Sequence, residues 1–191
     1  MKRRGPNALL VKALGAATVL FLVVVAVAFL LPGDYRVERS TLVQAPIDVV
    51  RSRIADLSTW PQWSAWSRTG DPSCEFELQP SSGALEWQGD VHGHWRIAFA
   101  GGAPNERLEH ELASYEGEHA VRSRGTIDLV AQGGATRVTW TVEGHMPREP
   151  VQRLVGFLMD GALGPKFEQS LDGLARSFAP APNEANAPST P

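Results

Sequence analysis

The sequence predicts an α+β domain, an antiparallel sheet covered by one long C-terminal helix, that follows a single membrane-spanning helix. Residues 13–31 carry no charge, short runs between residues 37 and 143 alternate apolar and polar side chains, and residues 149–178 repeat apolar side chains at helical spacing. A helix cannot bury an apolar stripe alone. The sheet predicted upstream is therefore expected to receive the stripe of the last helix.

Length and composition are those of a globular protein with one domain. The chain has 191 residues, of which 43% are hydrophobic and 20% are charged, enough for one well-formed core. The net charge of −3 argues against the basic surface that a nucleic-acid-binding protein needs, so nucleic acid is not expected among the partners. The single cysteine, Cys74, excludes an intramolecular disulfide and a cysteine-based metal cluster.

The apolar segment 13–31 is predicted to cross a membrane once. At about 1.5 Å per helical residue its length matches a hydrocarbon core of about 30 Å, and Pro32 and Gly33 then end the helix. The basic residues of segment 1–12 predict a cytoplasmic N-terminus and an extracytoplasmic domain, either periplasmic or at the cell surface. The alternative is a cleaved signal peptide, because residues 26–28 are Ala-Val-Ala. The apolar run continues beyond them, which favours a retained anchor.

The exported segment is predicted to be one domain over residues 34–178. It begins with an alternating run, Tyr35–Gln44, that is typical of an edge strand. Pro46 and Asp48 then open a short amphipathic helix. The apolar residues of this helix are Val49, Val50, Ile54 and Leu57.

Three tryptophans follow at a spacing of three residues, namely Trp60, Trp63 and Trp66. This spacing places them on one face of a tight helical turn. They are interpreted either as an aromatic plug that closes one end of the core or as the rim of a binding cavity. The two interpretations are compatible, and the sequence leaves both open.

Residues 75–143 are predicted to form an antiparallel meander with one apolar and one charged face. The runs alternate at the period of two that strands require, and Gly133-Gly134 marks a hairpin turn. The residues with inward parity are Phe76, Leu78, Leu85, Trp87, Val91, Trp95, Ile97, Phe99, Leu108, His110, Leu112, Val138, Trp140 and Val142.

His92 and His94 have the spacing that a pair of metal ligands on one strand would need. Their parity, however, is opposite to that of the apolar residues, so both are expected to face solvent. No third ligand is recognisable beside them. The sequence therefore predicts no metal and no cofactor.

The last helix is predicted to carry apolar side chains along both halves. Gly161, Gly164 and Pro165 predict a kink or a break between the halves, and Asp160 and Glu168 are expected on its solvent face. A tail rich in Pro, Ala and Asn over residues 179–191 is predicted to be disordered. The apolar stripe consists of Val151, Leu154, Val155 and Leu158 in the first half and Phe167, Leu171, Leu174 and Phe178 in the second.

The element order is that of the helix-grip arrangement, and the chain resembles the SRPBCC (START/Bet v1-like) superfamily, in particular its polyketide cyclase/dehydrase and lipid-transport branch. The resemblance covers the exported part of the chain, and it implies a deep apolar cavity between the sheet and the C-terminal helix. The motifs that carry it are residues 45–50 (APIDVV), residues 56–63 (DLSTWPQW), residues 136–140 (TRVTW) with Glu143-Gly144, and Phe167, Leu171 and Leu174 in the last helix.

Taken with the anchor, the resemblance predicts membrane-anchored binding or transport of a hydrophobic small molecule or lipid. Two alternatives stay open. One is a polyketide cyclase/aromatase-like enzyme in which His110 acts as general base, although no catalytic constellation is recognisable. The other is a tethered interaction module without a ligand. The residues expected to line the cavity are Phe76, Leu78, Trp87, Trp95, Ile97, Phe99, Leu108, His110, Leu112, Val138, Trp140, Leu154, Leu158, Phe167 and Leu171.

Overall fold

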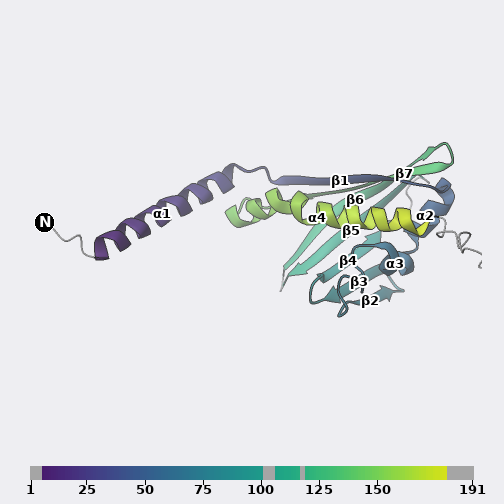
Figure 1. The fold of residues 1–191 in the computed structure, drawn as a ribbon, viewed down its shortest axis with the longest axis horizontal. Helices are drawn as coiled ribbons and strands as arrows, with labels where there is room; N and C mark the ends of the chain where they lie inside the picture. The colour runs from purple at the N-terminus through teal and green to yellow at the C-terminus, as the bar shows by residue number, and fades with distance from the viewer. Residues whose placement is uncertain (1–5, 101–105, 117–118, 180–191) are drawn as a thin grey trace, which may run out of the picture.

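A computed structural model describes residues 6–100, 106–116 and 119–179 of the chain. Its first element is helix α1 (Pro6–Leu30), which extends away from the rest of the protein (Figure 1). The stretch Leu9–Leu30 is long and apolar enough to cross a membrane, and almost none of it is buried. The helix thus contains nearly all of the segment predicted from the sequence. The predicted tail, apart from its first residue, lies outside the described residues.

Seven antiparallel strands form one sheet in the order β1-β7-β6-β5-β4-β3-β2. Strands β2 to β7 follow one another as a meander, and β1 closes the sheet beside β7, at the edge predicted for it. Gly133 and Gly134 make the β6–β7 hairpin turn with φ values of +58° and +93°, a region that favours glycine. The strands are β1 (Asp34–Val43), β2 (Glu75–Gln79), β3 (Ala84–Gly89), β4 (Gly93–Phe99), β5 (Arg107–Glu116), β6 (His119–Gln132) and β7 (Ala135–His145).

Between β1 and β2 the chain forms α2 (Ile47–Ala55), a 3₁₀ turn (Leu57–Thr59) and α3 (Trp60–Trp63). The predicted amphipathic helix is confirmed, but Val49 is half exposed and does not belong to its buried face. Trp60, Trp63 and Trp66 are all buried, as an aromatic plug requires. The indole N–H of Trp60 donates to the carbonyl of Ile54 at 2.8 Å, which fixes the plug against α2.

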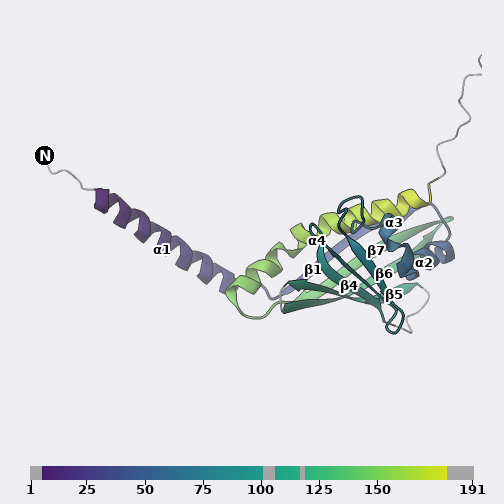
Figure 2. The same ribbon diagram turned by 90° about the horizontal axis from the view of Figure 1, so that it is seen from below.

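Helix α4 (Pro150–Ser177) lies along the inner face of the sheet and contacts β1 throughout much of its length (Figure 1). It is one continuous helix that includes Pro165, so the sequence-based alternative of a break is wrong. The helix bends partway along its length in Figure 2. A bend is the expected effect of an internal proline, which removes one hydrogen bond of the helix.

The two halves of α4 differ in burial. Phe167, Leu171 and Leu174 of the second half are buried against the sheet, as predicted. The stripe of the first half, which includes Leu154 and Leu158, is exposed, so the expectation that the sheet buries it is wrong. Nine positions separate Leu158 from Phe167, and at about 100° per residue they amount to two and a half turns. The two stripes therefore lie on opposite sides of a continuous helix.

An ion-pair cluster fastens the middle of α4 to the edge strand β1. Arg39 donates from Nε to Glu168 at 2.5 Å and from Nη1 and Nη2 to Asp160 at 2.9 and 3.1 Å. Both carboxylates are exposed, as expected. Gly164 makes room for the guanidinium, because a Cβ atom there would lie 2.2 Å from Nη2 of Arg39. The cluster fixes the position of α4 along β1.

Candidate functional site

The space between the sheet and the second half of α4 is filled by aromatic side chains. Trp140 of β7 stacks on Phe167 of α4 with ring centroids 4.3 Å apart and an interplanar angle of 7°. Trp66 packs between Trp87 and Trp95 at centroid distances of 5.3 and 6.0 Å. All six tryptophans of the chain belong to this one aromatic cluster. Each pair is worth roughly 0.5–1.5 kcal/mol beyond the burial of its area.

The structure distributes the predicted cavity residues over three environments. Three of them are half-buried, namely Phe76, Trp95 and Phe99. Leu78 is 47% exposed because β2 is the far edge of the sheet, and Leu154 and Leu158 are exposed on the outer side of α4. The buried members are Trp87, Ile97, Leu108, His110, Leu112, Val138, Trp140, Phe167 and Leu171.

His110 of β5 lies inside, as its parity predicts, and its imidazole is neutral. The indole N–H of Trp140 donates to its Nε2 at 3.1 Å, so Nε2 is the acceptor and the proton of the neutral ring is on Nδ1. Burial lowers the pKa of His110 to about 4, and an interaction of the ring N–H with the main-chain carbonyl of Leu108 opposes that shift only in part. Gly125, which pairs with His110 across β5 and β6, makes room for the imidazole ring. A Cβ atom at Gly125 would lie 2.6 Å from Cε1 of His110.

Two N–H groups in this apolar interior make no well-formed hydrogen bond among the described residues. They are Nε1 of Trp87, and Nδ1 of His110, which has only the main-chain carbonyl of Leu108 beside it. An unpaired buried donor is costly, and in native proteins it usually meets a water molecule or a polar atom of a ligand. With its Nε2 already engaged by Trp140, His110 offers a donor to a bound molecule and not a free base.

At one end of the sheet three residues of the inner face are only half-buried. The strand register places Trp95, Ser114 and Val121 side by side across β4, β5 and β6, and we refer to these three residues as the open row. All three are half-buried. The open row lies toward the end of the sheet where β1 begins and β7 ends, which is also the end beside α1. The Trp95 indole is held by a 2.7 Å hydrogen bond from Nε1 to the carbonyl of His92.

His92 is buried, so its expected exposure is wrong. It precedes β4 and lies in a turn, where strand parity does not apply. Its main-chain N–H donates to the buried carboxylate of Asp71 at 2.9 Å, and Val91 N–H does so at 2.8 Å. Hydrogen bonds from the Ser73 hydroxyl and from these N–H groups lower the pKa of Asp71 to about 2. Sequence reasoning missed Asp71, although Asp-Pro-Ser is a typical turn sequence in which Asp bonds the chain two residues on.

His94 has different surroundings from His92. Its Nε2 lies 2.5 Å from a carboxylate oxygen of Glu86, and its ring stacks on Tyr115 with centroids 4.5 Å apart. The two histidines therefore do not converge on one point. In the part of the chain that the structure describes, no three His, Cys, Asp or Glu side chains are placed to hold a metal ion.

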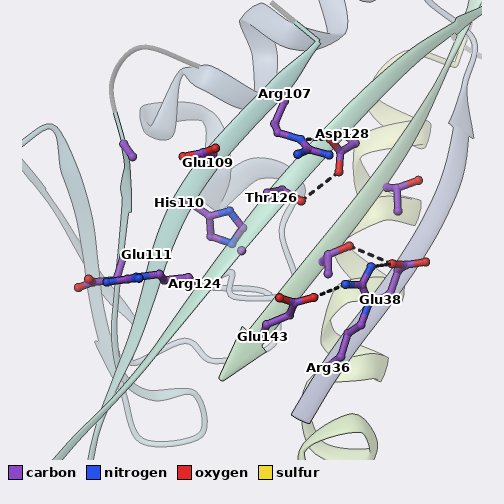
Figure 3. A pocket seen from close by; sticks show the side chains of 14 residues that line it. Arg36, Glu38, Arg107, Glu109, His110, Glu111, Arg124, Thr126, Asp128 and Glu143 are labelled. Atoms are coloured by element: carbon purple, nitrogen blue, oxygen red, sulfur yellow. Dashed lines mark hydrogen bonds and ion pairs between the residues drawn. The ribbon is translucent and has the colours of Figure 1, made fainter. Parts of the chain in front are cut away.

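The outer face of the sheet carries a pocket of about 770 Å³ lined mainly by charged and threonine side chains (Figure 3). His110 and Gly125 also line it, although the His110 side chain is buried. Arg36 pairs there with Glu38 and Glu143, and Arg107 pairs with Asp128 at 2.5 Å. A second hollow of about 700 Å³ adjoins it and shares Arg36, Glu111, Arg124 and Glu143. These polar surfaces match the predicted charged face of the meander. They do not suit an apolar ligand.

The fold is similar to solved structures at low sequence identity. A START superfamily protein from Mycobacterium smegmatis is 16% identical with a TM-score of 0.51, and the match covers 75% of this chain and 97% of that chain. The protein XoxI from Bacillus cereus is 14% identical with a TM-score of 0.53, covering 75% and 95%. A protein from Rhizobium leguminosarum is 19% identical with a TM-score of 0.53, covering 76% and 94%. Such likeness concerns the fold alone, and it agrees with the helix-grip prediction.

No curated protein matches this chain. The family model described as "Polyketide cyclase / dehydrase and lipid transport" matches residues 34–179, which is the whole sheet together with α4. The resemblance stated from the sequence motifs is thereby confirmed. The chain belongs to the polyketide cyclase/dehydrase and lipid-transport family.

Proposed function

We propose that this protein binds a hydrophobic small molecule or lipid on the inner face of its sheet, from a position tethered to a membrane by α1. The family supports the ligand class, since its fold implies binding of hydrophobic ligands. The observation that carries the proposal is the open row, where the aromatic interior meets the surface at the end of the domain nearest α1. A ligand that leaves a bilayer would reach this row first.

The chemistry of the interior suits such a ligand. The residues around the open row and behind it are aromatic and aliphatic, and the N–H groups of Trp87 and His110, which make no well-formed hydrogen bond, would be the polar anchors that an otherwise apolar site needs. A carbonyl, ether or hydroxyl oxygen of the ligand would accept from either group. Because His110 is neutral near pH 7, it would bind such an oxygen without requiring a counter-charge.

The membrane position rests on α1. Its apolar stretch has the length of a bilayer span, and the basic residues before it favour a cytoplasmic N-terminus with the domain on the other side. Transport would follow if the domain released its ligand to an acceptor. Binding alone requires no such step.

The open row is tested by photolabelling of the full chain in phosphatidylcholine vesicles that contain a fatty acid with a diazirine at its chain end. After irradiation and digestion, we expect adducts on peptides that contain Trp95, Ser114 or Val121. Ser114→Arg places a charge in the half-buried row, so it is expected to abolish these adducts while adducts on α1 remain. Thr139→Arg, on the outer face of β7, is the matched control and is expected to change neither set.

Adducts confined to α1 and α4, with none on β4, β5 or β6, would contradict ligand binding at the open row. That outcome would favour the second candidate, a tethered interaction module without a ligand. One observation speaks for this candidate, namely the direct stacking of Trp140 on Phe167, which leaves no space between the sheet and the second half of α4 at that point.

A further inference from the structure

The first half of α4 presents an apolar surface to the outside of the molecule. Its exposed side chains have exposed fractions between 39% for Leu154 and 74% for Val151. We refer to this set as the α4 patch, and it consists of Val151, Leu154, Val155, Phe157 and Leu158. Isolated exposed apolar residues are ordinary, but a contiguous group on one helix marks a surface that binds something.

The α4 patch has a sharp boundary along the helix. Beyond Pro165, the same side of α4 carries Gln169, Asp172 and Arg176, which are all exposed and polar. The opposite side of the first half is covered by protein, because Gly156 is buried and a Cβ there would lie 2.8 Å from Cγ of Met146. The apolar exposure is therefore confined to the outer side of the half next to α1.

Hydrogen bonds hold this half of α4 at the end of the apolar span. Nη1 of Arg153 donates to the carbonyl of Leu31 at 2.7 Å, one residue after α1 ends. Met146, which precedes α4 and lies against Gly156 of this half, donates its main-chain N–H to the carbonyl of Gly33 at 2.8 Å. The α4 patch therefore begins within one helical turn of Arg153, which is bonded to the residue that follows α1. Figure 2 shows α1 and α4 meeting there.

We propose that the α4 patch lies in the surface of the membrane that α1 crosses, with its side chains among the lipid acyl chains. This inference rests on the proposed membrane anchor. A helix with one apolar side that lies in a bilayer surface inserts about 5–10 Å into the boundary between headgroups and acyl chains. Arg153, the one charged residue between Val151 and Leu158, turns away from this side to bond Leu31. The patch would bring the open row to the membrane surface.

The test places a fluorophore on the full chain in vesicles of phosphatidylcholine and phosphatidylglycerol. In a Cys74→Ala background, NBD is attached at Leu158→Cys, at Gln169→Cys or at Phe21→Cys, and doxyl-labelled lipids serve as quenchers. Leu158 and Gln169 are exposed on the same side of α4, eleven positions apart, so they form a matched pair. Phe21 lies within the span and reports on the anchor itself.

We expect quenching and a blue-shifted emission at positions 21 and 158, with neither at position 169. Quenching at 21 without quenching at 158 would overturn docking of the α4 patch and leave the anchor standing. A blue shift at 158 without lipid quenching would assign the patch to contact with a second copy of the chain, which also overturns the proposal. No quenching at 21 would remove the anchor and the inference together. Because all three positions are exposed to the outside of the fold, labelling should leave the far-ultraviolet circular dichroism unchanged.

Discussion

Replacing Trp140 with alanine is expected to lower the free energy of unfolding by about 3–5 kcal/mol, the usual loss for a large buried aromatic side chain. Trp140 is fully buried, stacks on Phe167 and packs edge-on against Trp60 at 5.3 Å. Its N–H is also the described partner of His110 Nε2, which the substitution would leave unpaired. Urea unfolding of the full chain in detergent micelles, followed by circular dichroism, measures the loss.

Val130→Ala is the control for Trp140→Ala. Val130 lies on the neighbouring strand β6 and is 55% exposed, so its truncation should change the free energy of unfolding by no more than about 0.5 kcal/mol. If both variants changed stability by a similar small amount, the aromatic cluster would not be the centre of the core.

Gly173→Ala is expected to destabilise the protein by about 1–3 kcal/mol, because the added methyl group has no space. A Cβ atom at this position of α4 would lie 2.0 Å from the carbonyl oxygen of Trp63. That oxygen belongs to the main chain, so a change of side-chain rotamer cannot relieve the clash. Either α4 or α3 must move, and thermal unfolding of the purified full chain reports the cost.

Gly161→Ala, in the same helix, is expected to have the opposite effect on stability. No atom lies within 4 Å of a Cβ built there, so Gly161→Ala should raise the free energy of unfolding by about 0.5–1 kcal/mol through helix propensity alone. The two substitutions are chemically identical and differ only in their surroundings. Equal effects of the same sign would contradict the placement of α4 against α3.

The alternation of apolar residues predicted most of the sheet correctly, since parity needs no knowledge of the rest of the fold. His110 and Trp140 lie inside as their positions in the strands required. Parity failed at His92, because the strand begins one residue later and a turn has no alternating faces. Parity was also insufficient at Leu78, because no other part of the protein buries that side of the edge strand β2. Coverage depends on where α4 lies over the sheet, which local sequence does not specify.

The long helix shows what a pattern can and cannot predict. Both apolar stripes lie along α4 as predicted, and burial against the sheet was expected for both. Only the stripe with Phe167 and Leu171 is buried. The spacing between Leu158 and Phe167 already places the two stripes on opposite sides, so the phase of the whole helix could have separated them. The open row, in contrast, combines residues of three strands, and only the register of the sheet brings them together.

Native mass spectrometry of the full chain, purified from membranes in mild detergent, tests the central claim of hydrophobic ligand binding most directly. We expect a second mass species that carries one small molecule, identified after organic extraction as a lipid, isoprenoid or polyketide. Ser114→Arg should remove this species and Thr139→Arg should retain it. A single ligand-free mass that does not shift when a lipid extract is added would contradict the account and support a tethered interaction module.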